Sequence, residues 1–326
     1  MKKGTSSYLC IGFSMMALAM QPSTAAAAQA PGGGQRKMAL ATASLGGTYY
    51  IVGAGIADLL TKNVPGLKVD AIIAQGSVGN PRLVDSGEVQ LAITNYTSAI
   101  AALKGEKPYN KKMKIAGIMP LQFSILHLMV NGNDKSINSL ADIKGKKVAM
   151  GPAGGGGALL FMRLLPFWGL SAKDISPSYL SYSDGTDALK DGNVAMNIPH
   201  GAYPLEAVTS MTVQQSVKLI PIDDAHLTQV SAKYPDYEKA IIPAGTYPGV
   251  DKDVPGIGIR DILVVNSDVD DQTVYAITKT IAENIEKLRV LHPSVKALSM
   301  DGYRASLVPL HPGARKYYEE KGIKVQ

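Results

Sequence analysis

The feature that most constrains the fold is a strand, a glycine-rich loop and a helix that occur in this order twice. Residues 38–57 read MALATASLGGTYYIVGAGIA, and residues 147–162 read KVAMGPAGGGGALLFM. Glycine lets the backbone turn sharply and approach another group closely. The free N–H groups at the start of the following helix make such a unit a ready site for an anion. A tight turn that only joins two elements would have the same pattern.

The segments after the two units are also similar. Residues 83–92 read LVDSGEVQLA, and residues 189–196 read LKDGNVAM. Two similar α/β lobes, each offering one loop, predict a cleft that is closed from both sides. The alternative is that the two segments are similar by chance, because the order strand, turn, helix is common in α/β chains.

The N-terminus has the pattern of a secretory signal peptide. Two lysines precede an apolar stretch, Tyr8–Met20, which is too short to span a membrane, and Ala26–Ala28 offers small residues for cleavage. We expect a signal peptide over 1–28, a flexible leader over 29–36, and export to the periplasm. Cys10, the only cysteine, falls in the signal peptide, so the mature chain is predicted to have no disulfide, thiol nucleophile or thiolate metal site.

Charge and composition argue against several classes of function. The formal net charge is +6 and aromatic residues make up 6% of the chain, so neither a basic footprint nor a stacking platform for nucleic acid is evident. The short lysine clusters at 111–114 and 144–147 are interpreted as solvated turns. The five histidines show no metal spacing, and no Gly-x-Ser-x-Gly elbow is present. We therefore expect no catalytic residue, no metal and no cofactor, and a monomer.

Short apolar strands alternate with helices along the chain, which indicates an α/β fold with largely parallel sheets. The predicted strands are Met38–Ala43, Val69–Ala74, Leu91–Thr94, Ile115–Met119, Ile125–Val130, Val148–Met150, Val194–Ile198, Leu219–Ile222 and Ile262–Val265. The predicted helices are Tyr49–Asn63, Val78–Ser86, Thr97–Leu103, Ala158–Trp168, Thr186–Asp191, Pro204–Thr209 and Thr273–Leu291. Two of the strands are expected to cross between the lobes, which makes lobe 1 discontinuous (37–124 and 263–326) around lobe 2 (125–262).

The candidate ligand-binding residues lie where loops meet helices or where strands end. They are Ser44, Gly47, Thr48, Tyr49, Ser77, Asn80, Asn95, Ala153, Gly154, Gly155, Gly156 and Tyr203. The hydroxyl and amide side chains could instead cap helices or turns, the second glycine loop could be a surface turn, and the tyrosine could pack in a core.

Three charged or titratable residues are less favoured as ligand contacts. His200 lies close to Tyr203 but is interpreted as a surface histidine. Arg82 and Arg260 could each hold a carboxylate with two hydrogen bonds, yet a structural ion pair is the commoner role.

Several segments together resemble the TAXI-type solute receptors of TRAP transporters. The matching segments run in order over the mature chain: Ser44–Tyr50, Gly76–Leu83, Ser139–Val148, Gly151–Gly157, Asp187–Gly192, Gly201–Pro204, Ile242–Gly249 and Pro309–Ala314. The resemblance implies a type II periplasmic-binding-protein fold, in which two α/β lobes enclose a ligand cleft. It also implies a small carboxylate ligand and delivery of that ligand to a TRAP transporter membrane subunit.

The chain departs from the family pattern at three places. Leu45 replaces a second hydroxyl residue in the first loop, Gly154–Gly157 contains no hydroxyl, and Gly79 replaces a carboxylate. These changes leave more backbone donors and less negative charge, which fits a carboxylate held by N–H groups. They also allow the ligand to differ from the glutamate-like or 2-oxoacid ligands that the resemblance implies. The predicted ligand is a small organic anion of the glutamate-like, 2-oxoacid or dicarboxylate class. The alternative is a periplasmic enzyme on the same fold, such as a thiamine-pyrimidine synthase-like protein or a dehydratase.

Overall fold

The computed structural model describes residues 35–326, so the predicted signal peptide and nearly all of the predicted leader lie outside the described residues. Within 35–326, no helix combines the length and the apolar character that crossing a membrane would require.

The first lobe is a parallel arrangement of β1 (Arg36–Ala41), β2 (Leu67–Ile72) and β3 (Leu91–Asn95) that carries helices from both ends of the chain. These helices are α1 (Thr48–Asn63), α2 (Asn80–Ser86), α3 (Tyr96–Lys104), α8 (Asp271–Glu283), α9 (Ile285–Arg289) and α10 (Pro312–Lys321), with a 3₁₀ turn at Pro293–Val295. One core cluster contains buried residues of 38–121 and of 262–318. The core of these elements therefore combines two separate stretches of the sequence.

The second lobe is built on a sheet of five short strands in the order β10-β5-β8-β6-β7. The strands are β5 (Met129–Asn131), β6 (Lys147–Ala149), β7 (Ser176–Ser178), β8 (Met196–Asn197) and β10 (Val217–Leu219). The helices are α4 (Gly156–Leu164), α5 (Tyr182–Lys190), α6 (Glu206–Gln214) and α7 (Asp224–Lys233), and 3₁₀ turns lie at Leu140–Ile143, Leu165–Trp168 and Ala172–Asp174.

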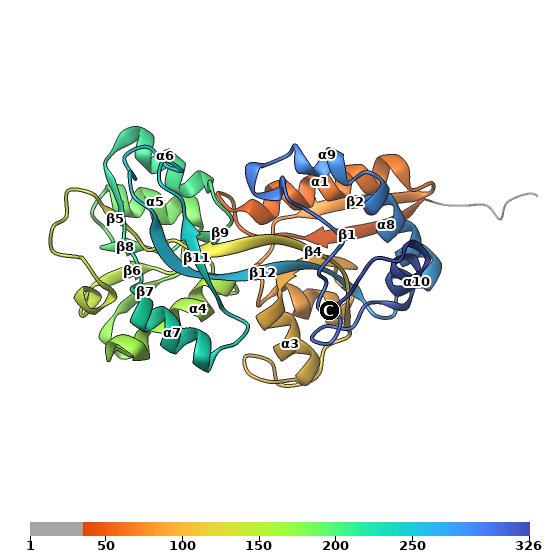
Figure 1. The fold of residues 1–326 in the computed structure, drawn as a ribbon, viewed down its shortest axis with the longest axis horizontal. Coiled ribbons are helices and arrows are strands. Elements are labelled where there is room, and N and C mark those ends of the chain that lie inside the picture. The colour runs from red at the N-terminus through yellow and green to blue at the C-terminus, as the bar shows by residue number, and fades with distance from the viewer. Residues whose placement is uncertain (1–34) are drawn as a thin grey trace, which may run out of the picture. The chain divides into compact units, whose positions relative to one another are not determined.

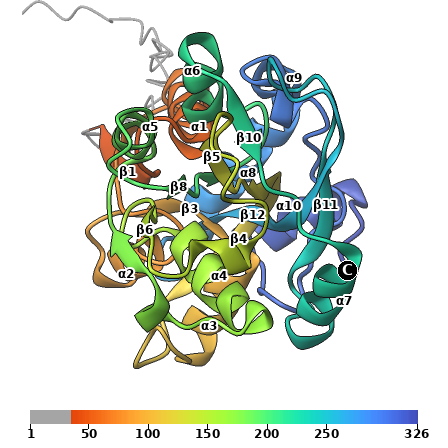
Figure 2. The same ribbon diagram turned by 90° about the vertical axis from the view of Figure 1, so that its left-hand side faces the viewer.

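Neighbouring residues of these strands face two different cores, as the two-residue period of a strand requires. Val130 and Val148 pack in the cluster that contains α4, whereas Met129 and Ala149 pack in the cluster that contains α6. Figure 2 shows α4 on one side of the short strands and α5 with α6 on the other. Both faces of the second sheet are thus covered by helices.

Two long antiparallel strands, β4 (Ile115–Leu126) and β12 (Val254–Asn266), join the lobes. In Figure 1 they run side by side from the elements of the first lobe to those of the second. The short strands β9 (His200–Gly201) and β11 (Glu238–Ile242) pair with their second-lobe ends. The prediction of two α/β lobes is confirmed, while the exact lobe boundaries stay a prediction. The prediction of largely parallel sheets is wrong, because β12 pairs antiparallel with β3, β4 and β11, and β4 pairs antiparallel with β9.

The crossing strands are longer than the sequence predicted. The predicted strands Ile115–Met119 and Ile125–Val130 are replaced by β4 and the short β5, and Ile262–Val265 is only the end of β12. Pro120 pairs at an irregular point of the ladder, where a proline is tolerated. There, Leu121 and Gln122 stand opposite the single residue Asp261, which is the arrangement of a β-bulge.

The helix predictions differ from the structure at the C-terminal side. The predicted helix Thr273–Leu291 ends at Asn284 and restarts as α9, and the helix predicted at Pro204–Thr209 begins at Glu206. Helices α7 and α10 were not predicted, since both are largely polar on their exposed faces.

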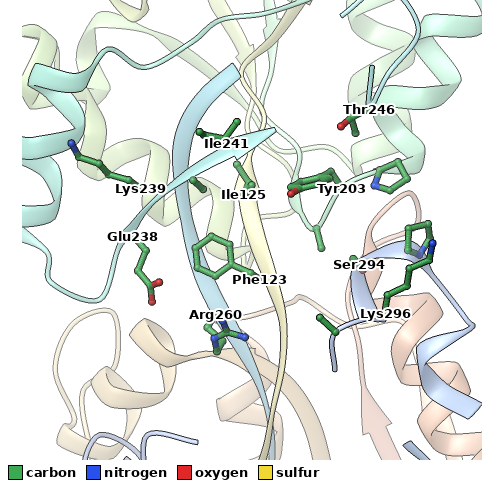
Figure 3. Close-up of a pocket in the computed structure, with 15 residues that line it drawn as sticks. Phe123, Ile125, Tyr203, Glu238, Lys239, Ile241, Thr246, Arg260, Ser294 and Lys296 are labelled. Atoms are coloured by element: carbon green, nitrogen blue, oxygen red, sulfur yellow. The ribbon is translucent and has the colours of Figure 1, made fainter. Parts of the chain in front are cut away.

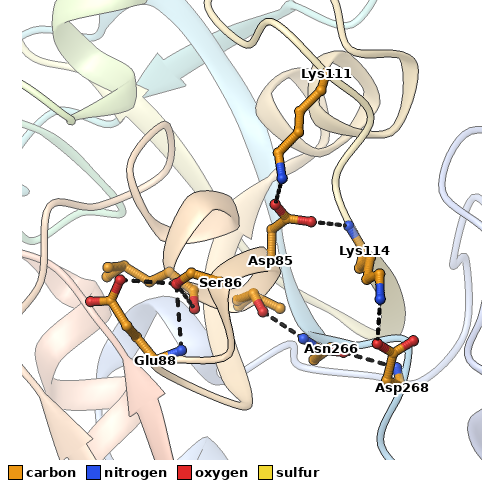
Figure 4. Close-up of polar contacts among 9 residues, drawn as sticks. Asp85, Ser86, Glu88, Lys111, Lys114, Asn266 and Asp268 are labelled. Atoms are coloured by element: carbon orange, nitrogen blue, oxygen red, sulfur yellow. Dashed lines mark hydrogen bonds and ion pairs between the residues drawn. The ribbon is translucent and has the colours of Figure 1, made fainter.

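Polar contacts fix the end of α2 against the start of β4 and the end of β12 (Figure 4). Asp85 pairs with the Lys111 ammonium at 2.7 Å and accepts from the Lys114 backbone N–H at 2.9 Å. The Lys114 ammonium pairs with Asp268 at 2.7 Å. The hydrogen bonds from Lys111 and Lys114 lower the pKa of Asp85. This lysine cluster therefore has a structural role in the first lobe.

Candidate functional site

Two helices, one from each lobe, begin at the same buried pocket. Helix α1 starts after Gly47 and α4 starts after Gly155, and neither helix has a side-chain cap. In contrast, side chains cap the starts of α3, α5, α7 and α8. An uncapped start leaves backbone N–H donors free and carries the positive end of the helix dipole. The pocket therefore receives donors and partial positive charge from both lobes.

The space enclosed between these helix starts is small. The pocket has a volume of about 20 Å³, which is room for about one water molecule. It is lined by Ala43, Gly47, Thr48, Tyr49, Gly76, Ser77, Pro152, Gly155, Gly156, Tyr182 and His200. A larger ligand can enter only if the lobes move apart.

Contacts between the lobes hold the pocket closed. The Gly154 carbonyl accepts hydrogen bonds from the backbone N–H groups of Val78 at 2.9 Å and Gly79 at 3.2 Å. On the other side, the Ala202 N–H donates to the Thr48 hydroxyl at 3.4 Å. The lobes therefore touch through hydrogen bonds on both sides of the pocket.

Gly156 marks the closest approach of the lobes. A Cβ at this position would lie 2.7 Å from the Asn95 amide nitrogen and 2.9 Å from the Ser77 hydroxyl oxygen. Separations this short are essentially never found for real Cβ atoms, so with a larger residue either the Asn95 and Ser77 side chains or the first turn of α4 would have to shift. A larger residue would therefore disturb the closest contact between the lobes.

Two buried polar atoms near the pocket have no hydrogen-bond partner within the described residues. They are the Ser44 hydroxyl oxygen and Nε2 of His200. His200 is 8% exposed, and burial, followed by the nearby His127, lowers its pKa to about 4. The imidazole is therefore neutral at physiological pH. Buried polar atoms without partners are rare in folded proteins, so these two atoms are suited to a bound ligand or water.

A chain of hydrogen bonds leads from the pocket to the crossing strands. The Tyr49 hydroxyl lies 2.9 Å from the Ser77 hydroxyl and donates to Asp261 at 2.5 Å. The Ser124 hydroxyl donates to the other carboxyl oxygen of Asp261. Burial raises the pKa of Asp261 to about 7, although these hydroxyl groups and Arg260 act in the opposite direction. Burial also raises the pKa of Tyr49, so the tyrosine stays a hydrogen-bond donor.

The structure brings together half of the predicted ligand-binding residues. Those that line the pocket are Gly47, Thr48, Tyr49, Ser77, Gly155 and Gly156. Ser44 and Asn95 lie directly beside them. The Asn95 side chain accepts from the Ser98 N–H and caps α3, and its amide nitrogen also faces Gly156.

Asn80 positions the loops rather than facing the pocket. Its side chain is fully buried. The amide nitrogen donates to the carbonyl groups of Thr42 at 2.7 Å and Ile93 at 2.8 Å, and the amide oxygen accepts from the Gly76 N–H at 3.1 Å. It therefore ties the first loop and the start of α2 to β3.

Three predicted residues have other positions. Ala153 and Gly154 do not line the pocket, and the carbonyl group of Gly154 makes the contact between the lobes described above. Tyr203 lines a separate, larger cavity on the other face of the crossing strands.

The two arginines differ in their surroundings. The Arg82 guanidinium donates to the carbonyl groups of Val78 and Pro108 and lies 4.7 Å from the centre of the Tyr109 ring. It therefore packs around the first lobe and does not line the pocket. Arg260 lines the same separate cavity as Tyr203.

Sequence reasoning missed three residues of the site. Tyr182 and Asp261 were not considered as site residues, and His200 was interpreted as a surface histidine but is buried. A charged residue inside an apolar strand was the one available signal for Asp261. Tyr182 and His200 reach the pocket only through the folding of the second lobe.

Among residues 35–326, no group of three or more metal-ligating side chains lies close enough to hold an ion. What the described geometry offers is hydrogen-bond donors and partial positive charge in a space between two lobes. Such a site favours a bound anion.

Comparison with solved structures finds similar folds at low sequence identity. A protein from Bordetella bronchiseptica RB50 is 14% identical, with 86% of this chain and 82% of that chain covered and a TM-score of 0.54. The periplasmic aliphatic sulphonate binding protein SsuA from Escherichia coli is 17% identical over 88% of both chains, with a TM-score of 0.46. The alkanesulfonate-binding protein SsuA from Xanthomonas axonopodis pv. citri, bound to MOPS, is 14% identical. The comparison covers 88% of this chain and 93% of that chain, with a TM-score of 0.48.

The first of these likenesses supports the fold. The sequence itself also matches a family model, that of the NMT1-like family, over residues 40–322. The match covers both lobes and both crossing strands. The chain therefore belongs to the NMT1-like family.

Proposed function

We propose that this protein is an extracytoplasmic solute-binding receptor that captures a small organic anion between its lobes. The ligand is a carboxylate of the glutamate-like, 2-oxoacid or dicarboxylate class. It enters while the lobes are apart and is enclosed when they come together.

The meeting of two uncapped helix starts from opposite lobes carries this proposal. A carboxylate placed there would accept backbone hydrogen bonds from α1 and α4 at once, so it would favour the closed arrangement of the lobes. Nε2 of His200 and the Ser44 hydroxyl would supply further contacts, since both are buried without a partner in the described chain. None of these groups is a cation, so the shape and the direction of the donors would select the ligand.

The present volume of the pocket requires the lobes to stand further apart in the ligand-bound state than they do here. About 20 Å³ is too little for any amino acid or dicarboxylate. The antiparallel strands β4 and β12 are the two connections that a rotation of the lobes would bend, and the bulge at Asp261 lies within them.

The transport role rests on the resemblance to TAXI-type receptors. In this proposal the receptor acts in the periplasm as a monomer, needs no cofactor, catalyses no reaction, and passes its ligand to a TRAP transporter membrane subunit. Membership of the NMT1-like family and the names of the similar solved structures support a binding protein. A gene for a TRAP membrane subunit next to the gene for this chain would support this partner.

A thermal-shift screen of amino acids, 2-oxoacids and dicarboxylates tests the binding function. At a concentration 100 times the dissociation constant, a true ligand stabilises the folded state by about 2.7 kcal/mol. Gly156→Ala should abolish the shift, because its Cβ would crowd Asn95 and Ser77 where the two lobes meet. Gly256→Ala is the matched control, since its Cβ would make only ordinary contacts. A broad carboxylate panel that gives no shift with the wild-type protein would refute the proposed ligand class.

A further inference from the structure

A second cavity lies on the opposite face of the crossing strands from the pocket. Its volume is about 680 Å³. Side chains alternate between the two faces of a strand. Ser124 and Asp261 face the Tyr49 network, whereas their neighbours Phe123, Ile125 and Arg260 line this cavity. We name it the rear cavity.

Both lobes contribute walls to the rear cavity, as Figure 3 shows. From the second lobe come Tyr203 and the β11 residues Ala240 and Ile241. From the first lobe comes the turn after α9, with Ser294 and Ala297. The cavity therefore has a floor of crossing strands and two walls that belong to different lobes. Its volume falls in the range of small-molecule binding sites.

The floor of the rear cavity carries a cation that no carboxylate neutralises. Among the described residues, Arg260 makes no ion pair, and its only hydrogen bond is a 3.4 Å contact with the Leu121 carbonyl. Its guanidinium lies 5.8 Å from the centre of the Phe123 ring. A half-buried guanidinium with free N–H groups is suited to a planar anion.

The other charged residues around the rear cavity are already paired or lie at its rim. Glu238, the acidic residue of the wall, pairs with Arg304 at 3.0 Å. Lys239 also lines the cavity, and its ammonium lies 3.7 Å from Asp224, which does not line it. Lys296 is exposed at the rim and makes no ion pair within residues 35–326. The lining therefore keeps a net positive charge.

We propose that the rear cavity is a second small-molecule site, which takes an aromatic carboxylate. The carboxylate would pair with Arg260, and the ring would pack against Phe123, Tyr203 and Ile241. This site is separate from the pocket of the proposed function, because the backbones of β4 and β12 lie between them. It therefore stands whether or not the pocket binds a transported anion.

Calorimetric titration with sodium 2-naphthoate tests the second site. The wild-type protein should bind one molecule at millimolar concentration or below. Arg260→Gln should weaken binding at least about tenfold, and Arg315→Gln, which changes an exposed arginine on α10, should not. Ala297→Trp should abolish binding by filling the cavity, whereas Ala172→Trp, at an exposed alanine away from it, should not.

An uncharged analogue and a pocket variant complete the test. 2-Naphthalenemethanol should bind at least about tenfold more weakly than 2-naphthoate if the guanidinium recognises the anion. Ser44→Ala should bind 2-naphthoate like the wild type, since the Ser44 hydroxyl is buried near the pocket and has no hydrogen-bond partner among the described residues. The proposal is overturned if no heat is released at millimolar 2-naphthoate, if Ala297→Trp binds like the wild type, or if the alcohol binds as tightly as the acid.

Discussion

Replacing Asp261 by asparagine is expected to change how the stability of the protein depends on pH. Burial raises the pKa of this carboxyl from 3.8 to about 7, whereas the unfolded chain has the ordinary value of about 3.9. Between these values the folded state holds a proton that the unfolded chain has released. The folded state therefore loses stability through this group as the pH rises from about 4 to about 7. A shift of about 3 units corresponds to about 4 kcal/mol.

Asp261→Asn removes this titration and keeps the shape of the side chain. Its amide oxygen can accept from the Tyr49 hydroxyl, and its amide nitrogen can donate to Ser124 after the serine hydroxyl turns. The variant should therefore gain stability relative to the wild type as the pH rises. The difference in free energy of unfolding should widen by about 3 kcal/mol between about pH 5 and pH 8, measured by urea titration at each pH.

Asp85→Asn is the control for this experiment. Its pKa is lowered by Lys111 and Lys114, so the stability that it contributes is present above the unfolded pKa and is lost only as the pH falls below about 4. The difference between this variant and the wild type should stay constant between about pH 5 and pH 8. If Asp261→Asn gives the same constant difference, the reasoning about a buried, protonated Asp261 is wrong.

Three further predictions concern binding and closure. Arg82→Ala should lower the free energy of unfolding by about 1–2 kcal/mol, and so the melting temperature by a few degrees. Its affinity for the anion should stay within about tenfold of the wild type. A hundredfold loss of affinity by calorimetry at unchanged melting temperature would contradict this. Tyr203→Phe should leave affinity in the pocket unchanged, because Tyr203 lines the rear cavity; a tenfold loss by calorimetry would place it at the pocket. Saturating anion should reduce the radius of gyration in small-angle scattering, and an unchanged radius would argue against closure.

The parts of the fold that were predictable from sequence depend on local patterns. Gly47 and Gly155 precede helices whose starts lack side-chain caps. The two glycine-rich loops in the sequence indicated where both helices begin. The apolar strands of the first lobe were predicted to within two residues at each end. Asp223 caps α7, although this helix was not predicted.

The polar network behind the pocket could not be predicted in the same way, because it depends on contacts between distant residues. Tyr49 and Asp261 are 212 residues apart in the sequence. They meet only because β12 returns beside β4 and a bulge places Asp261 opposite Leu121 and Gln122. Tyr203 was predicted to bind the ligand but lines the rear cavity. His200, only three residues earlier in the sequence, lines the pocket instead.

Native mass spectrometry of gently purified protein tests the central claim most directly, because a receptor with a closed pocket retains its ligand. The account predicts that the wild-type protein carries one small organic anion per chain and that release under denaturing conditions yields a carboxylate. Gly156→Ala, prepared in the same way, should carry none, and Gly256→Ala should carry the same anion as the wild type. Retention of the same molecule by Gly156→Ala, or release of a neutral or cationic molecule from the wild type, would contradict capture of an anion between the two helix starts.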